Sequence, residues 1–160
     1  MRSGMRKKIV LWVLTLSVAV GIFAFSEQSA EQSSAISGAI TQGLLGGLFS
    51  LFEFSEAQQE IAHEMIRSMA HIFSFTLLGL FASLLSQSYH LKYWLPITVA
   101  PCAAYAVLDE CHQLWAAAGR AFEWIDVAKD CLGVLLGTGL AIAICRGAAR
   151  YRAKKQKEGN

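Results

Sequence analysis

The residues between positions 108 and 133 include most of the side chains of this chain that could perform chemistry. They include four acids, a histidine, a glutamine and an arginine: Asp109, Glu110, His112, Gln113, Arg120, Asp126 and Asp130. Apolar segments border the stretch, and ionisable groups at membrane depth are costly and usually mark function. We expect Asp109 and Glu110 at the C-terminal end of the preceding helix, where the helix dipole disfavours carboxylates. A requirement other than helix stability therefore explains their presence.

Helical spacing brings several of these side chains onto shared helix faces. Asp109 lies three residues before His112 and four before Gln113, and Asp126 lies four before Asp130. Residues three or four apart are neighbours on a helix surface. Acidic and basic groups gathered in one cavity would pair with one another, because uncompensated charges there are too costly. The sequence therefore predicts one polar cluster.

Two catalytic interpretations fit these residue types. His71 and His112 could bind zinc together with carboxylates, but neither HExxH nor another metal-binding spacing is present, so we predict no metal and no cofactor. Alternatively, a histidine and a carboxylate could act as general acid and base in a membrane-embedded hydrolase or transferase that acts on a lipid-linked substrate. The candidates for that role are His71, Asp109, Glu110 and His112. Because the sequence has no nucleophile elbow and no phosphatase-like basic cluster, we lean against an enzyme.

The same residues could instead bind a polar head group, a role that requires no catalytic arrangement. Arg67 and Arg120 can hold a phosphate or a carboxylate, and the acids and Gln113 can accept hydrogen bonds from hydroxyl, amine or amide groups. One alternative is a structural polar network that joins the helices without any ligand, and another is a passive membrane scaffold for other envelope proteins. The predicted ligand-binding residues are Arg67, His71, Asp109, Glu110, His112, Gln113, Arg120, Asp126 and Asp130. For any one of them the structural role is the safer interpretation, whereas for the whole cluster we favour binding.

Composition indicates that these residues belong to a membrane protein. The chain has 160 residues, of which 54% are hydrophobic and only 16% charged, and its mean hydropathy is +0.41. Such values are typical of a chain that resides in a bilayer. Both ends are basic, but no basic fold and no alternation of basic and aromatic residues lies between them, which excludes nucleic acid as a partner. The cysteines form no CxxC pair and are predicted to be small buried residues: Cys102, Cys111, Cys131 and Cys145.

Four apolar segments are long enough to position this cluster within a membrane, and they predict an all-α polytopic fold. The segments cover residues 9–25, 69–85, 93–108 and, starting near Phe122 or Trp124, up to Cys145. The first could also be a secretory signal peptide. We favour an uncleaved helix, because Phe23 and Phe25 are bulky where a signal peptidase requires small residues.

The region between the first two segments is more polar. Residues 26–37 are rich in serine and glutamine and predict an aqueous loop. In residues 44–67, apolar and charged side chains then recur at four-residue intervals, which predicts an amphipathic helix in the membrane interface. The alternative is a solvated helix face that packs on its neighbours. We thus divide the chain into a basic N-terminus (1–8), a four-helix membrane domain (9–145, with the external loop and interfacial helix at 26–68) and a basic tail (146–160).

The distribution of basic residues predicts the orientation. If both termini lie in the cytoplasm, that side has the ten terminal bases and Lys92, whereas the outer side has only Arg67, Arg120 and Lys129. Basic residues in short loops favour the cytoplasmic face. We therefore expect the protein in the cytoplasmic membrane of a bacterium, with the polar cluster near the outer face of that membrane.

Three segments resemble the VanZ-like family. The most specific is YAVLDECHQLWAAAGRAFEWIDVAKDCLGVLLG (105–137), which matches the family pattern of an aspartate–glutamate pair, histidine–glutamine, glycine–arginine, an aspartate and a glycine-rich last helix. FSEQSAEQSS (25–34) is similar to the polar stretch after the first helix of the family. RSMAHIFSFTLLG (67–79) is similar to its histidine-bearing second helix.

The resemblance carries the family's polar positions onto His71, Asp109, Glu110, His112, Gln113, Gly119, Arg120, Asp126 and Asp130. Where related chains often have a glutamate and a tyrosine after the histidine, this chain has Ser74 and Phe75, and Ala118 replaces a proline that often precedes glycine–arginine. The loss of the glutamate weakens an enzymatic interpretation. The resemblance implies a bacterial multi-pass membrane protein linked to low-level resistance to teicoplanin, a lipid-tailed glycopeptide. The implied partners are membrane lipids and either a lipid-linked wall precursor or this antibiotic.

Overall fold

The fold, given by a computed structural model, consists of five helices, and the described part of the chain contains no strand. The structure describes residues 2–27, 30–52, 55–116 and 121–158. The helices are α1 (Arg2–Ser26), α2 (Ala30–Phe52), α3 (Glu56–Ser88), α4 (Trp94–Ala116) and α5 (Trp124–Glu158). The predicted all-α class is confirmed.

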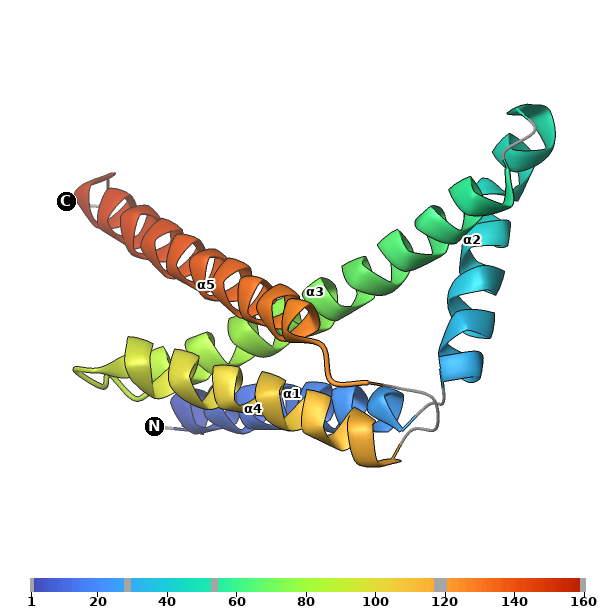
Figure 1. The fold of residues 1–160 in the computed structure, drawn as a ribbon. Helices are drawn as coiled ribbons and strands as arrows, with labels where there is room; N and C mark the ends of the chain where they lie inside the picture. Colours follow the sequence, from blue (N-terminus) through green and yellow to red (C-terminus); the bar gives the residue numbers. More distant parts are fainter. Residues whose placement is uncertain (1, 28–29, 53–54, 117–120, 159–160) are drawn as a thin grey trace.

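The helices α3 and α4 pack against each other and against both α1 and α5, whereas α2 projects from this group and contacts α3 near its start (Figure 1). Both chain ends lie on the same side of the molecule in this view. A small core of buried apolar residues joins the four packed helices, with Ile22 from α1, Phe75 from α3, Ala106 from α4 and Val134 from α5. The ends of α1 and α4 and the start of α5 thereby come near the middle of α3.

Three helices are long and apolar enough to cross a membrane: Gly4–Ser26, Glu56–Ser88 and Trp124–Glu158. They correspond to the first, second and fourth predicted spans, and apolar side chains such as Val10, Leu16 and Leu135 are exposed on their outer faces. The third predicted span corresponds to α4, which is not among the three. The last third of α4 has Asp109, Glu110, His112 and Gln113, and these residues lower its mean hydropathy.

Close backbone packing joins α3 to α5. The buried Gly133 and Gly137 of α5 face α3, and Gly79 of α3 faces α5. A Cβ atom added at Gly137 would lie 2.6 Å from the backbone nitrogen of Leu80, and one at Gly79 would lie 2.9 Å from Cα of Val134. Glycine therefore permits a helix separation that any side chain would widen.

Two local predictions were wrong. Residues 30–37, expected in an aqueous loop, form the start of α2. Their alanine, glutamate and glutamine residues are good helix formers, so a polar composition did not exclude a helix. Asp109 and Glu110 do not end a helix, because α4 continues to Ala116. The effect of the helix dipole falls off within the last turn, and so it does not act against these acids.

The amphipathic helix predicted for residues 44–67 is not confirmed, because residues 44–52 belong to α2 and residues 56–67 to α3. The helix α3 starts at Glu56 and continues without interruption through the second predicted span. Ser55 precedes it as N-cap, and the Ser55 and Gln58 side chains form a reciprocal capping box. This cap fixes where α3 begins. The helix then presents Arg67 and His71 one turn apart, near the ends of α1 and α4.

Candidate functional site

The predicted polar cluster forms where α1, α3, α4 and α5 meet. Its acids are buried although their side chains are ionisable: Asp109, Glu110, Asp126 and Asp130 are each at most 5% exposed. Buried charges are costly unless they are paired. The partners of these acids divide the cluster into two halves.

The ion-paired half lies on α3 and α5, and we define it as Arg67, His71, Asp126, Lys129 and Asp130. Asp126 lies 2.6 Å from Lys129 Nζ and 3.9 Å from an Nη atom of Arg67. His71 Nδ1 lies 3.1 Å from Asp130 Oδ1. The close approach of α3 and α5 brings these oppositely charged groups together.

The hydroxyl–amide half lies on α1 and α4, and we define it as Ser26, Asp109 and Gln113. The Ser26 hydroxyl donates to Asp109 Oδ1, and Gln113 Nε2 donates to Asp109 Oδ2 at 2.9 Å. Both carboxylate oxygens of Asp109 therefore accept hydrogen bonds from neutral groups. The four-residue spacing predicted the Gln113 contact, whereas Ser26 was not predicted as a site residue. Its only signal was its position as the polar residue that ends the first apolar run.

The two halves meet at His71, Asp109 and Asp130. One possible ligand atom from each of these side chains lies within 4.8 Å of the other two. An imidazole nitrogen and two carboxylate oxygens are a donor set that metal ions use. The residues come from α3, α4 and α5, so no local spacing in the sequence could predict their arrangement.

Two predicted residues have other roles in this structure. Glu110 Oε2 accepts a hydrogen bond at 3.1 Å from the backbone N–H of Glu123. The Glu123 carbonyl in turn accepts from Asp126 and Val127 in the first turn of α5. Glu110 thus holds the start of α5, where a negative charge is favourable. His112 stacks on Phe23 of α1, with ring centroids 4.1 Å apart.

A cavity of about 390 Å³ opens beside the cluster. Its wall is mainly apolar and comes from α1, α2 and α3: Ile22, Phe25, Ile36, Ile40, Ile66 and Phe73. Its polar lining includes Ser26, Arg67, His71, Asp109 and Gln113. The cavity can therefore accommodate an apolar chain and a polar group side by side. Glu110, His112, Asp126 and Asp130 do not line it.

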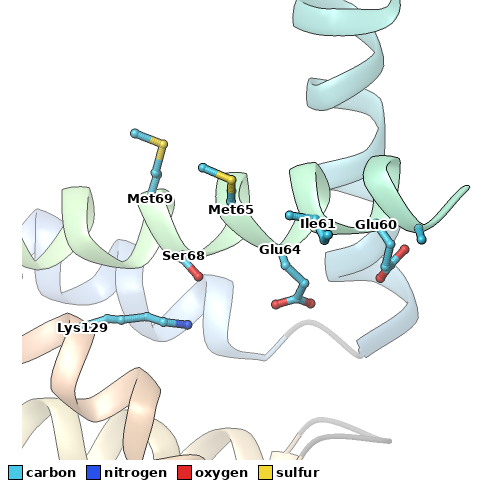
Figure 2. Close-up of a pocket in the computed structure, with 8 residues that line it drawn as sticks. Glu60, Ile61, Glu64, Met65, Ser68, Met69 and Lys129 are labelled. Atoms are coloured by element: carbon cyan, nitrogen blue, oxygen red, sulfur yellow. The ribbon is translucent and has the colours of Figure 1, made fainter. Parts of the chain in front are cut away.

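A larger groove of about 750 Å³ runs along the first part of α3 and contains none of the predicted site residues. Figure 2 shows Glu64 and Ser68 on the side of α3 near Lys129, with Met65 and Met69 on the opposite side. The groove lacks buried polar groups that could select a ligand. We therefore assign the candidate site to the smaller cavity.

Arg120 and Gly119 lie outside the described residues. Among the residues that the structure describes, four of the predicted site residues have a buried polar atom without a hydrogen-bond partner: Arg67 Nε, Glu110 Oε1, His112 Nδ1 and Asp130 Oδ2. Of these four residues, only Arg67 lines the cavity. Buried polar groups are normally hydrogen-bonded, so each of these atoms indicates where a ligand could bind.

Comparison with known proteins identifies a family. A family model described as VanZ/LLP1 matches residues 11–146, which include every predicted site residue. No match was found among curated proteins or among solved structures.

Proposed function

The chain belongs to the VanZ/LLP1 family, and from that premise we propose that it binds the anionic head group of an amphiphile in the cavity beside the polar cluster. The amphiphile is a lipid-linked precursor of the bacterial cell wall or a lipid-tailed glycopeptide such as teicoplanin. Its apolar chain occupies the wall formed by α1, α2 and α3. Its head group contacts Arg67, Asp109 and Gln113.

The observation that carries this proposal is the state of Arg67. Its side chain lines the cavity, and its two ion pairs, with Glu64 and Asp126, are long at 3.8 and 3.9 Å. Its buried Nε atom has no partner among the described residues. A guanidinium group binds phosphate or carboxylate through two parallel hydrogen bonds. An anionic group in the cavity would supply the partner that Arg67 Nε lacks.

The other polar residues of the cavity suit the rest of a head group. Asp109 retains lone pairs that can accept from hydroxyl or amide groups, and Gln113 supplies an amide. Apolar walls with a few placed polar groups are the usual composition of a small-molecule site.

The proposed topology has four membrane-spanning helices, α1, α3, α4 and α5. The apolar residues 94–108 of α4 pack against the other three, which supports α4 as the additional span. The polar first turns of α3 lie in the interface and the cluster near the outer face. Both termini lie in the cytoplasm, in agreement with their basic residues. The location is the cytoplasmic membrane of a bacterium.

The test measures the affinity of the full chain in nanodiscs for three probes: a polyprenyl pyrophosphate, teicoplanin and the zwitterionic phosphatidylcholine as reference. We expect saturable binding of at least one anionic probe. Arg67→Gln should weaken it about tenfold, since hydrogen bonds to charged groups contribute about 1.5–3 kcal/mol. Lys129→Gln is the matched control, because Lys129 also pairs with Asp126 but does not line the cavity.

Equal affinity of the wild type and Arg67→Gln for both anionic probes would exclude the proposal. An equal loss in Lys129→Gln would also count against it, because the effect would then be one of bulk charge. The anionic probe that binds more tightly shows whether the amphiphile is a lipid-linked wall precursor or a lipid-tailed glycopeptide.

One observation favours a second candidate, a hydrolase or transferase acting on a lipid-linked substrate. Asp130 lies within hydrogen-bonding distance of His71, and His71 lines the cavity, so the pair could orient and activate a general base. This partner differs from Asp109 and Glu110, the carboxylates expected from the sequence. His71→Gln would abolish turnover of the polyprenyl pyrophosphate in this case and leave its binding largely intact.

A further inference from the structure

We propose that His71, Asp109 and Asp130 form a binding site for one divalent transition-metal ion, of the type of Zn²⁺ or Mn²⁺. This inference does not depend on the proposed head-group binding. It differs from the expectation from sequence, which named His71 and His112 as the histidines and did not favour a metal. His112 stacks on Phe23 and is not one of the three ligands. The carboxylate of Asp130 on α5 takes its place in the proposed site.

The first support is geometric. The three candidate ligand atoms lie within 4.8 Å of one another, and His71 Nδ1 and Asp130 Oδ1 are 3.1 Å apart. Two ligand atoms of a tetrahedral zinc ion, each about 2.1 Å from the metal, are roughly 3.4 Å apart. Small side-chain rotations would therefore bring all three atoms into coordination distance.

The second support is an unpartnered oxygen. Asp130 is 0% exposed, and its Oδ2 atom has no hydrogen-bond partner in the described part of the chain. A buried carboxylate oxygen without a donor is costly. Coordination of a cation by Asp130 would compensate for this cost.

The third support is the distribution of charge. Two of the described basic side chains, Arg67 and Lys129, lie within 4 Å of a buried acid of the cluster, and both lie at Asp126. Asp109 accepts from the neutral Ser26 and Gln113, and Asp130 faces His71. Two carboxyl groups that no lysine or arginine of the described residues contacts therefore meet at this point, and a divalent cation would compensate the charge of their ionised forms.

The donor set selects the class of metal. One imidazole nitrogen with two carboxylate oxygens suits Zn²⁺, Mn²⁺ or a similar ion, whereas Mg²⁺ and Ca²⁺ prefer oxygen ligands alone. The hydrogen bonds from Ser26 and Gln113 to Asp109 resemble the outer partners that orient metal-binding carboxylates. Three protein ligands leave coordination positions for solvent.

The experiment uses the full chain, purified in detergent and stripped with a chelator. Zn²⁺ affinity is measured by competition with a chromophoric chelator, Mn²⁺ binding by electron paramagnetic resonance, and Mg²⁺ serves as the disfavoured ion. We expect one equivalent of Zn²⁺ or Mn²⁺. Asp130→Asn and Asp109→Asn should each weaken binding at least about tenfold, since even outer partners of a metal contribute 10- to 100-fold. Asp126→Asn, a buried acid one turn from Asp130, is the control and should retain the metal.

A spectroscopic readout keeps the test decisive if an aspartate variant does not fold. Pulsed electron paramagnetic resonance of bound Mn²⁺ should show coupling to an imidazole nitrogen in the wild type, and His71→Gln should remove it. The proposal is overturned if the wild type binds no more metal than the Asp109→Asn, Asp130→Asn double variant. It is also overturned if Asp126→Asn loses the ion equally, or if bound Mn²⁺ shows no nitrogen coupling.

Discussion

The ion-paired half and the hydroxyl–amide half of the polar cluster hold their acids by different means. In the ion-paired half, Asp126 and Asp130 face basic side chains across two helices whose backbones nearly touch. In the hydroxyl–amide half, Asp109 accepts from Ser26 and Gln113, and α1 and α4 have no comparable glycine contact among those described. Helix packing therefore fixes the first half, whereas individual hydrogen bonds fix the second.

This difference indicates which contacts set the geometry of the site. Gly79, Gly133 and Gly137 set the distance between α3 and α5, and so they set the spacing of the charged groups. The hydroxyl–amide half then adds α1 and α4 to this pair. Substitutions should consequently have large effects at the glycines, smaller effects at the ion pairs and the smallest at a single hydroxyl.

The largest effect is expected for Gly137→Leu. A side chain there would overlap the backbone of Thr76 and Leu80 and force α3 from α5. Overpacking of this kind lowers the free energy of unfolding by roughly 1–3 kcal/mol. Because the overlapped atoms belong to the backbone and cannot rotate away, we expect a loss of about 3 kcal/mol or more. Thermal unfolding of the detergent-solubilised protein should show a clear fall in the transition midpoint.

The control for that variant is Gly139→Leu. Gly139 lies two residues further along α5 and has no atom within 4 Å of an added Cβ. The midpoint should stay unchanged or rise slightly, because leucine has a higher helix propensity than glycine. Equal destabilisation by both substitutions would show that α3 and α5 do not pack through these glycines.

An intermediate effect is expected for Asp126→Asn. The change leaves Lys129 and Arg67, both mainly buried, without their shared carboxylate. Removal of one partner from a fully buried ion pair costs about 3–5 kcal/mol, and the partial exposure of both bases reduces this to about 2 kcal/mol. Glu64→Gln, which removes an exposed carboxylate from the same Arg67, should change the unfolding free energy by less than about 0.5 kcal/mol. Similar losses in the two variants would contradict the distinction between buried and exposed pairs.

The smallest effect is expected for Ser26→Ala. The variant loses one hydrogen bond to Asp109, while Gln113 still donates to the other oxygen. A hydrogen bond contributes about 1 kcal/mol, so urea unfolding should show a loss of that order. Thr15→Ala, whose hydroxyl donates only to the carbonyl of Leu11 in its own helix, should lose less. If Ser26→Ala lowered the unfolding free energy as much as Asp126→Asn does, the proposed difference between the two halves would be contradicted.

Sequence patterns predicted the elements of this fold better than their ends. Apolar run length predicted the spans in α1, α3 and α5. The end of α4 was misplaced because charged residues resemble a helix end. Here Asp109 is stabilised by partners on α1 and α4, and Glu110 by the start of α5, so the helix continues past both.

The site was predictable as a set of residue types but not as a set of partners. The sequence indicated that His71, Asp109 and Asp130 belong together, and three ligand atoms from them do meet. It could not indicate that Ser26 binds Asp109, because the two are 83 residues apart and serine is common at helix ends. Likewise, the stacking of His112 on Phe23 depends on how α1 and α4 pack.

Side chains from distant parts of the chain converge beside one cavity in this structure. Cysteine cross-linking in native membranes tests this convergence directly, in a chain whose four native cysteines are replaced by alanine. Ser26→Cys with Asp109→Cys should react rapidly with a short bifunctional thiol reagent. The matched pair Ser26→Cys with Leu108→Cys should not, because Leu108 is adjacent in sequence but 62% exposed. No reaction of the first pair, or equal reaction of both, would contradict the convergence on which the site depends.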